Sequence, residues 1–394
     1  MIVIAGKNEI AIHGLKLALQ SFPVSDVLAV VNSTDAGHDG WQPSFLKFAK
    51  EAGVAIKTIK EIYDCELSVF LSLEFDKIVR VDRLRTDKVF NIHFSLLPKY
   101  KGMYTSVWPV LFNEKESGVT LHAIDSGIDT GAIYAQKRFV LDAEDRAQDC
   151  YRKYISASKE LLSENFDFII NGFPAEPKLQ AAEGATYFSK STIDFRELAI
   201  DFKKCAWEVK RQIHAFGFRP YQFLSFHGKP VVNASILTTR SGAKPGEAVG
   251  EACFSGVTVS TIDYDIRLFF DGLDDFLAAI PNINVSELPY RLQGIAGVND
   301  RNEKGWSPII VAAYHGRLDI MRYLLQIGAD VNDTNYKGTT VLMYAKDYAL
   351  KSRDASIIDF LIASGADQAR RDYQGKSIFE YISCLDAKFL GLTK

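Results

Sequence analysis

The chain has 394 residues, 47% of them hydrophobic, which is enough for a sizeable core in two or three domains. Its formal net charge is −3 and no lysine or arginine stripe is visible, so a nucleic-acid partner is not expected. No apolar run reaches the roughly 18 residues that a membrane span needs. The start, MIVIAGKNEIAIHG, lacks the charged region and cleavage site of a secretory signal. We therefore expect a cytoplasmic protein without a membrane partner.

The five cysteines are odd in number, widely scattered and form no CxxC pair. This distribution predicts reduced thiols in a cytoplasm and argues against a disulfide framework or a metal site. The cysteines are Cys65, Cys150, Cys205, Cys253 and Cys384.

Residues 1–180 are expected to form the first domain, because short β-rich runs alternate there with amphipathic stretches. This order predicts an α/β fold, a Rossmann-like and mainly parallel sheet with helices on both faces. Its ligands would bind at the carboxyl ends of the strands. The first loop, AGKN, is not GxGxxG, so a dinucleotide site is not indicated. The candidate strands are 1–6, 26–32, 67–73, 88–94, 118–125 and 131–141, and a long helix is expected over 143–171.

Residues 181–285 read as a helix followed by a small antiparallel β-rich domain. The helix is expected over 197–216, and the β-like runs cover 223–239 and 256–270.

Residues 286–394 repeat with a period of about 33 residues, as seen between Gly305 and Gly338. The pattern GWSP, a helix pair and GADVN resembles ankyrin repeats, with two full units and a fragment. The second unit carries extra residues near KDYALKSRD, which we expect between its helices. Because repeats bury their faces only by stacking, this short α-helical array is expected to pack on the preceding domain.

Two motifs carry candidate chemistry. NIHFSLLPKYKG places Asn91 and His93 on one face at the end of a buried strand, and GIDTG places Asp129 in a later turn. An amide, an imidazole and a carboxylate are suited to moving an acyl group onto an amine. Asn91 would stabilise the oxyanion, an effect of about 3–4 kcal/mol per donor. His93 would accept the amine proton or donate to the oxyanion and leaving nitrogen, and Asp129 would orient the imidazole or relay a proton through water.

The motif pair resembles the 10-formyltetrahydrofolate-dependent formyltransferases, which share Asn-x-His-x-Ser-x-Leu-Pro and a DTG turn. The resemblance covers roughly residues 1–235. It implies that Asn91, His93 and Asp129 are the catalytic trio and that 10-formyltetrahydrofolate is the formyl donor. It also implies a pterin-contacting loop, whose residues here are Asp125, Ser126, Gly127 and Ile128.

KYKGMYTS is most similar to the branch that acts on nucleotide-linked amino sugars, with Lys101 in place of an arginine. Phe195 and His214 likewise replace a tryptophan and an arginine of that branch, so contacts at those two positions are in doubt. Within the branch, the chain resembles dTDP-3-amino-3,6-dideoxyhexose N-formyltransferases of bacterial surface-polysaccharide (O-antigen) synthesis. The resemblance implies a dTDP-amino sugar substrate, 3-amino-3,6-dideoxyglucose or galactose, and a homodimer.

Three further residues are candidates for substrate binding. Lys77 follows a strand and would meet a phosphate or sugar, or else be a solvated lysine. Tyr104 would contact the substrate, or else be a packed loop aromatic. Tyr221 would reach the substrate from the second domain, or else pack locally.

Trp306 occupies an ankyrin position that is usually exposed and variable. An indole is a good platform for a flat base. With Tyr314 and Tyr344 it is a candidate second ligand site for the nucleotide-sugar. The alternatives are a partner interface or packing on the preceding domain.

Three other functions remain open. A dTDP-4-amino-4,6-dideoxyhexose N-formyltransferase differs only in the amine position, and a formyltetrahydrofolate hydrolase would use the same trio with water. An ankyrin-based interaction protein would have lost catalysis.

Overall fold

The structure is a computed structural model that describes residues 1–250 and 255–392. The chain divides into two compact units. Unit 1 consists of Met1–Leu198 and His214–Phe218, and unit 2 of Ala199–Ile213 and Arg219–Lys394. The domain boundaries predicted above, after residues 180 and 285, stay predictions.

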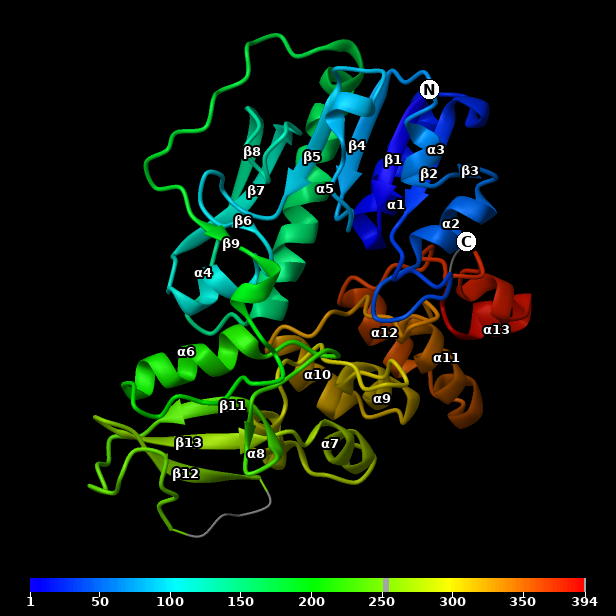
Figure 1. The fold of residues 1–394 in the computed structure, drawn as a ribbon. Helices are drawn as coiled ribbons and strands as arrows, with labels where there is room; N and C mark the ends of the chain where they lie inside the picture. The colour runs from blue at the N-terminus through cyan, green and yellow to red at the C-terminus, as the bar shows by residue number, and fades with distance from the viewer. Residues whose placement is uncertain (251–254, 393–394) are drawn as a thin grey trace. The chain divides into compact units, whose positions relative to one another are not determined.

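Unit 1 contains a seven-stranded sheet in the order β3-β2-β1-β4-β5-β7-β8 (Figure 1). β1 to β5 are parallel to one another, whereas β7 is antiparallel to β5 and to β8. The predicted mainly parallel sheet is therefore confirmed. A short pair of strands, β6 and β9, lies apart from it. The strands are β1 (Ile2–Gly6), β2 (Val27–Val31), β3 (Ala55–Ile56), β4 (Val69–Leu73), β5 (Val89–His93), β6 (Lys101–Gly102), β7 (Glu116–Ala123), β8 (Ile133–Val140) and β9 (Tyr187–Phe188).

Helices cover both faces of this sheet because its central strands are apolar on both sides. On one face, Val3, Phe70 and Val89 form a core with Ile59 and Ile62 of α3. On the other face, a Cβ at Gly14 of α1 would touch side chains of β1, β4 and α5, so α1 packs tightly there. The helices are α1 (Asn8–Ser21), α2 (Phe45–Glu51), α3 (Ile59–Ile62), α4 (Val107–Leu111) and α5 (Ala147–Asn171).

Unit 2 contains most of α6 (Ala206–Phe216) and an antiparallel sheet in the order β10-β11-β13-β12. The predicted antiparallel sheet is confirmed. The helix expected over residues 197–216 begins only at Ala206, because residues 197–205 form turns and irregular backbone. Its strands are β10 (Ser225–Phe226), β11 (Lys229–Ile236), β12 (Gly256–Ser260) and β13 (Asp265–Phe270).

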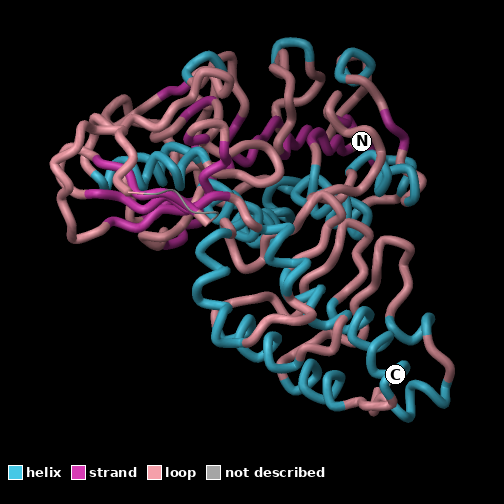
Figure 2. The backbone as a smooth tube through the Cα atoms, turned by 90° about the horizontal axis from the view of Figure 1, so that it is seen from below, coloured by secondary structure: helices cyan, strands magenta, loops and turns pink. Residues whose placement is uncertain are grey.

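The rest of unit 2 is built of helices and loops, which Figure 2 shows in cyan and pink. α9 and α10 form one helix pair, and α11 and α12 the next. The additional residues of the second repeat lengthen α11 rather than the connection between its helices, which corrects our expectation. The helices are α7 (Leu273–Ala279), α8 (Leu288–Arg291), α9 (Pro308–Tyr314), α10 (Leu318–Gln326), α11 (Val341–Ser352), α12 (Ser356–Ala363) and α13 (Cys384–Phe389).

One hydrophobic core joins the repeats to the residues before them. It runs from Leu273 and Phe276 of α7 through Ile309 and Leu324 to Leu392. Residues on both sides of the predicted boundary at 285 therefore share a core, and the expected packing of the array on the preceding segment is confirmed.

Four of the cysteines are free thiols, and Cys253 lies outside the described residues. Within residues 1–250 and 255–392, no helix has both the length and the apolar character to cross a bilayer.

Arg317 connects the first repeat to the end of α7. Its guanidinium donates to the carbonyls of Ile280 (2.7 Å), Pro281 (3.0 Å) and Ile283 (2.7 Å). Hydrogen bonds from a charged group to buried acceptors stabilise a fold by about 1.5–3 kcal/mol.

We therefore predict that Arg317→Met lowers the free energy of unfolding of unit 2 by about 1.5–3 kcal/mol. Denaturant unfolding of the full chain measures it. Arg370→Met, at an exposed arginine, is the control, and equal stability of the two variants would contradict this role of Arg317.

Candidate active site

β5 carries two polar side chains in an otherwise apolar strand, Asn91 and His93. They alternate with Phe90 and Ile92 and so share the face of Val89. β5 pairs with β4 on one side and with β7 on the other. The antiparallel register of β7 places His122 directly opposite Asn91.

The loop between β7 and β8 supplies Asp129, and it is held by hydrogen bonds of its own. The Oδ1 atom of Asp125 accepts from the Gly127 N–H (3.0 Å) and the Thr130 hydroxyl (2.6 Å). The Gln180 amide donates to the carbonyl of Asp129 at 2.9 Å and to that of Gly131 at 2.7 Å. Asp129 itself adopts a left-handed conformation with φ of 53°. The loop is thus fixed in a shape that an unconstrained aspartate rarely adopts.

The Asp129 carboxylate meets His93 and the loop after β5. Its Oδ2 atom lies 3.4 Å from His93 Nδ1 and accepts a hydrogen bond from the Gly102 N–H at 2.9 Å. The other ring nitrogen, His93 Nε2, lies 2.8 Å from the carbonyl oxygen of Tyr100. A carbonyl can only accept, so Nε2 carries a hydrogen. The proton that His93 can exchange is therefore the one at Nδ1, on the side of Asp129.

His122 completes the cluster, and it was missed by the analysis of the sequence. Its Nδ1–H donates to the carbonyl of Ala123 at 2.7 Å, which leaves Nε2 as an acceptor for the Asn91 amide N–H at 3.1 Å. Burial, and then the neighbouring charge of His93, lower the pKa of His122 to about 4. The ring is therefore neutral at physiological pH.

Neutral His122 orients Asn91. Because its Nε2 accepts, the Asn91 side chain must present its NH₂ group rather than its oxygen to the ring. One amide hydrogen is used in this contact and the second is available to a reacting group. Asn91, His93 and Asp129 are thus brought together as expected. The only sequence signal for His122 was a histidine in the apolar run GVTLHAID, and its position opposite Asn91 depends on a strand register that no local pattern specifies.

The four residues expected to contact a pterin directly precede Asp129 in the loop between β7 and β8. Asp125, Ser126, Gly127 and Ile128 are all exposed, although one carboxylate oxygen of Asp125 is used in the turn. Their contact with a pterin stays a prediction.

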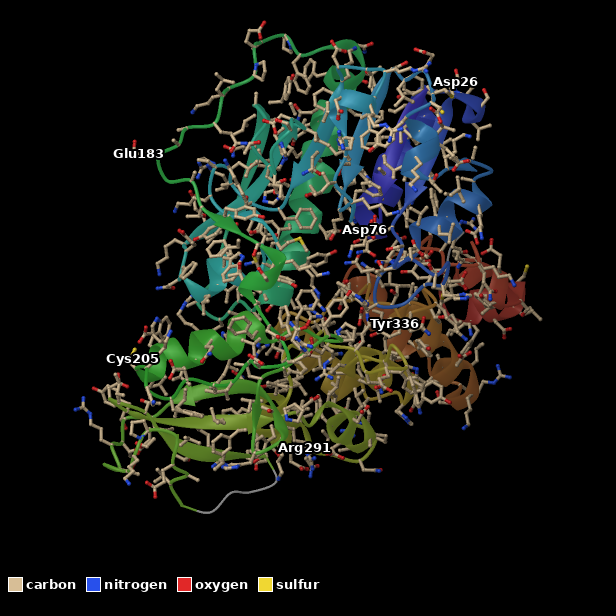
Figure 3. All side chains as sticks on the ribbon, viewed as in Figure 1. Asp26, Asp76, Glu183, Cys205, Arg291 and Tyr336 are labelled. Atoms are coloured by element: carbon tan, nitrogen blue, oxygen red, sulfur yellow. The ribbon has the colours of Figure 1, made fainter. Side chains whose placement is uncertain are left out.

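Within the part of the chain that the structure describes, the three candidate substrate residues do not contact Asn91, His93 or Asp129. Lys77 lies in the exposed loop after β4, next to Asp76, which is labelled in Figure 3. Tyr104 is half-buried, with its ring 5.0 Å from that of Phe195. Tyr221 belongs to unit 2 and is 60% exposed. Their contacts with substrate stay predictions.

In unit 2, the rings of Trp306, Tyr314 and Tyr344 lie close together, and their use as a second ligand site stays a prediction. Their centroids lie 5.7 to 6.2 Å apart. Tyr314 is 43% exposed, whereas Trp306 is half-buried and packs partly against the repeat core. The Tyr344 hydroxyl accepts from the Asn335 amide at 2.8 Å.

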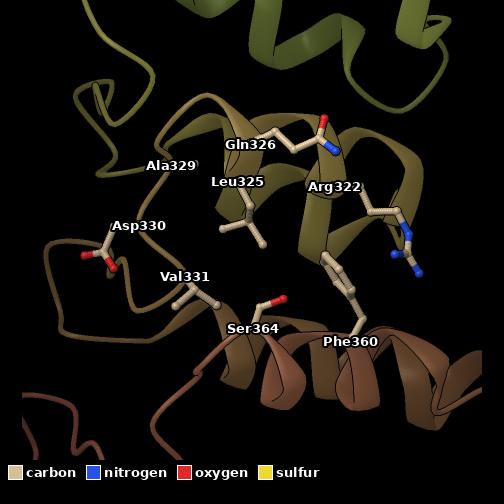
Figure 4. Close-up of a pocket in the computed structure, with 8 residues that line it drawn as sticks. All are labelled: Arg322, Leu325, Gln326, Ala329, Asp330, Val331, Phe360 and Ser364. Carbon is tan, nitrogen blue, oxygen red and sulfur yellow. The ribbon is translucent and has the colours of Figure 1, made fainter.

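A separate shallow pocket of about 550 Å³ lies between α10 and α12 (Figure 4). Leu325, Phe360 and Ser364 line it, and the Arg322 guanidinium lies 4.4 Å from the Phe360 ring centre. None of its lining residues belongs to the Trp306 cluster. Within the described part of the chain, no group of three or more His, Cys, Asp or Glu is placed to hold a metal ion.

Comparison with known proteins identifies a family for the N-terminal region and another for the C-terminal region of the chain. Residues 77–166 match the formyl transferase family, and residues 276–372 match ankyrin repeats in three copies. The chain is similar to the crystal structure of an N-formyltransferase from Helicobacter canadensis in complex with folinic acid and dTDP-3-aminofucose. The two are 38% identical with a TM-score of 0.62, over 68% of this chain and 98% of that one.

Two further relatives were found. A sugar 3N-formyl transferase solved in the presence of dTDP and 5-N-formyl-THF is 38% identical, with a TM-score of 0.61, over 68% of this chain and 97% of that one. The methionyl-tRNA formyltransferase of Coxiella burnetii is 29% identical over 180 residues, which are 45% of this chain. The chain spans only 56% of the length of that relative.

The electrostatics of the cluster predict how the pKa of His122 responds to its neighbours. The charge of His93 lowers this pKa and that of Asp129 raises it. His93→Gln should therefore raise the pKa of His122 from about 4, and Asp129→Asn should lower it further. NMR of histidine-labelled protein across a pH series measures both shifts. A His122 that titrates at its ordinary pKa in the unsubstituted chain would contradict the geometry.

Proposed function

Because the chain belongs to the sugar N-formyltransferases, we propose that it transfers a formyl group from 10-formyltetrahydrofolate to the amine of a dTDP-linked amino-dideoxyhexose. The observation that carries the proposal is the meeting of Asn91 and His93, from the end of strand β5, with Asp129, from the loop between β7 and β8. The relatives support it, because one was solved with folinic acid and a dTDP-amino sugar and another with dTDP and a formylated folate.

The amine at C3 of the sugar is favoured over the amine at C4. Support comes from the Helicobacter canadensis protein, which was solved with dTDP-3-aminofucose, and from the second relative, a sugar 3N-formyl transferase. The substrate would be a 3-amino-3,6-dideoxyglucose or galactose, for a bacterial surface polysaccharide such as the O-antigen. The proposal includes a cytoplasmic homodimer without a nucleic-acid or membrane partner. A 4-amino sugar is the alternative substrate.

10-Formyltetrahydrofolate, when bound, supplies the activated formyl carbon. The free N–H of Asn91 donates to the oxyanion that develops as the amine attacks, a contribution of about 3–4 kcal/mol. His93 Nδ1, together with the Asp129 carboxylate, takes the proton that the amine must lose and returns it to the leaving nitrogen. Tyr100 and Gly102 hold this pair in place through their backbone groups. His122 keeps the Asn91 amide turned the right way.

Two substitutions test these roles. Asn91→Ala should lower kcat by about 10²–10³-fold, because it removes the oxyanion donor. His93→Asn should lower kcat by about 10²–10⁴-fold, because the proton carrier is lost. Turnover is measured with 10-formyltetrahydrofolate and a dTDP-3-amino sugar. His13→Asn is the matched control, at a partly buried histidine of α1 whose Nε2 atom lies 2.8 Å from the Ser163 hydroxyl. Near-normal turnover of His93→Asn would refute the assignment.

The same assay separates the rival functions. Folate release without any amino sugar would identify a formyltetrahydrofolate hydrolase. Absence of folate binding, together with a stable protein partner, would identify an ankyrin-based interaction protein.

We propose in addition that Trp306, Tyr314 and Tyr344 bind a second nucleotide-sugar molecule through its base. Three rings that lie within 6.2 Å of one another, one of them 43% exposed, can stack on a flat heterocycle. Burial raises the pKa of Tyr344, so its hydroxyl stays protonated.

Trp306→Ala tests this second site. Equilibrium binding of the dTDP-sugar should fall from two molecules per chain to one, while the turnover of the formyl transfer stays intact. Trp207→Ala, at a tryptophan that is 37% exposed elsewhere in unit 2, is the control. Unchanged stoichiometry and affinity of the Trp306 variant would remove the second site.

A further inference from the structure

Glu74 is a titratable group at the edge of the sheet that the mechanism above does not use. It directly follows β4, whose last residue, Leu73, pairs with Ile92 of β5 and with Gly6 of β1. Glu74 therefore lies level with His93, which follows Ile92, and with the first residues after β1. The connections of the sheet reverse direction between β1 and β4, and this is where open α/β sheets bind ligands.

The backbone at this edge is strained on both strands. Asn8, after β1, and Glu74, after β4, have φ angles of 60° and 59°. This left-handed conformation is unusual for a glutamate and needs support from its surroundings. The support comes from Asn32, whose amide donates to the carbonyl of Glu74 at 2.8 Å. From this position the Glu74 side chain reaches Tyr151 of α5.

Tyr151 holds the Glu74 carboxyl in one position. Its hydroxyl lies 2.9 and 3.0 Å from the two carboxylate oxygens and accepts a hydrogen bond from the Gln42 amide at 2.9 Å. Burial raises the pKa of Tyr151 well above its ordinary value, so the phenol stays protonated and donates to Glu74. The Tyr151 ring is fixed in turn by aromatic rings that lie 5.6 to 5.7 Å away, those of Trp41, Phe94 and Phe218.

The Glu74 carboxylate has unused capacity to accept hydrogen bonds. A carboxylate offers about four acceptor positions, and the hydrogen bonds from Tyr151 and Asn8 fill two of them. Within the described residues, no ion pair of Glu74 is formed, and Lys7 acts on it only through space. Burial raises the pKa of Glu74 to about 7, against the attraction of Lys7 and the hydrogen bonds from Tyr151 and Asn8. Glu74 as a whole is nevertheless only partly buried, so a ligand can reach it.

We propose that Glu74, positioned by Tyr151, accepts hydrogen bonds from ring hydroxyls of the hexose and is a specificity-determining residue of the site. A hexose presents hydroxyl donors at its edge and apolar C–H groups on its faces. A carboxylate with free acceptor positions can bind the hydroxyl donors, and the half-buried indole of Trp41 can pack against the apolar C–H groups. The inference rests on the proposed function, because a sugar amine held at His93 places the neighbouring hydroxyls at the end of the adjacent strand, where Glu74 lies.

The test combines a change in the enzyme with the matching change in the sugar. Wild type, Glu74→Gln and Tyr151→Phe are each assayed with the dTDP-3-amino-3,6-dideoxyhexose and with analogues that lack the hydroxyl at C2 or at C4. dTDP is used as a competitive inhibitor in every assay. Glutamine keeps the size of the side chain but can accept at only one atom, and phenylalanine keeps the ring but frees the carboxyl.

We expect Glu74→Gln to raise the KM for the full substrate by about ten- to a hundredfold, with a smaller rise for Tyr151→Phe. For one deoxy analogue, wild type and Glu74→Gln should have nearly the same KM, because the missing hydroxyl was the partner of Glu74. The inhibition constant of dTDP should not change, which shows that the fold and the nucleotide site are intact.

Two results would count against the proposal in different ways. In the first result, the wild-type enzyme formylates the sugar, but the rise in KM caused by Glu74→Gln and the rise caused by removing either hydroxyl are additive. This result overturns the role of Glu74 and leaves the proposed function standing. A wild-type enzyme that formylates none of the dTDP-amino sugars overturns the proposed function on which the inference rests.

Discussion

The carboxylate of Asp129 is the contact on which the site depends. It joins the loop between β7 and β8 to the loop after β5, because the same oxygen faces His93 Nδ1 and accepts from the Gly102 N–H. The left-handed backbone of Asp129 and the hydrogen bonds from Gln180 fix the position of the Asp129 carboxylate. Without it, the imidazole would lose the partner at the only nitrogen that can exchange a proton.

A second constraint acts from the neighbouring strand. His122 is buried and neutral, and a neutral acceptor is what fixes the orientation of the Asn91 amide. In the proposed mechanism the two histidines therefore have different tasks: His93 exchanges a proton, and His122 orients the Asn91 amide. Their rings lie 6.3 Å apart, close enough for a charge on His93 to disfavour one on His122. This coupling keeps the amide in place while the proton moves.

Much of the fold and the identity of the trio could be predicted from the sequence. Apolar runs bounded by turn residues marked the strands of unit 1, and an amide, an imidazole and a carboxylate at loop positions indicated the chemistry. His122 could not be predicted, because its role depends on the register between β5 and β7. Glu74 was missed for a similar reason. An acidic residue after a strand is usually solvated, whereas the Glu74 carboxyl is held by Tyr151 of α5 at a left-handed turn, and neither feature is visible in the local sequence.

In the repeats, too, part of the structure could be predicted from the sequence and part could not. The period of about 33 residues and the helix pairs were readable from the sequence. The lengthening of α11 was not, because a local pattern does not show whether extra residues continue a helix or leave it.

The central claim is that the trio at the end of β5 formylates the amine of a nucleotide-linked sugar. The most direct measurement is a formylation screen of the purified chain over dTDP-linked 3- and 4-amino sugars with 10-formyltetrahydrofolate, with the products identified by NMR. The account predicts an N-formyl product at C3 of at least one 3-amino sugar. Formate release in place of any N-formyl sugar, or no reaction with the whole panel, would contradict it.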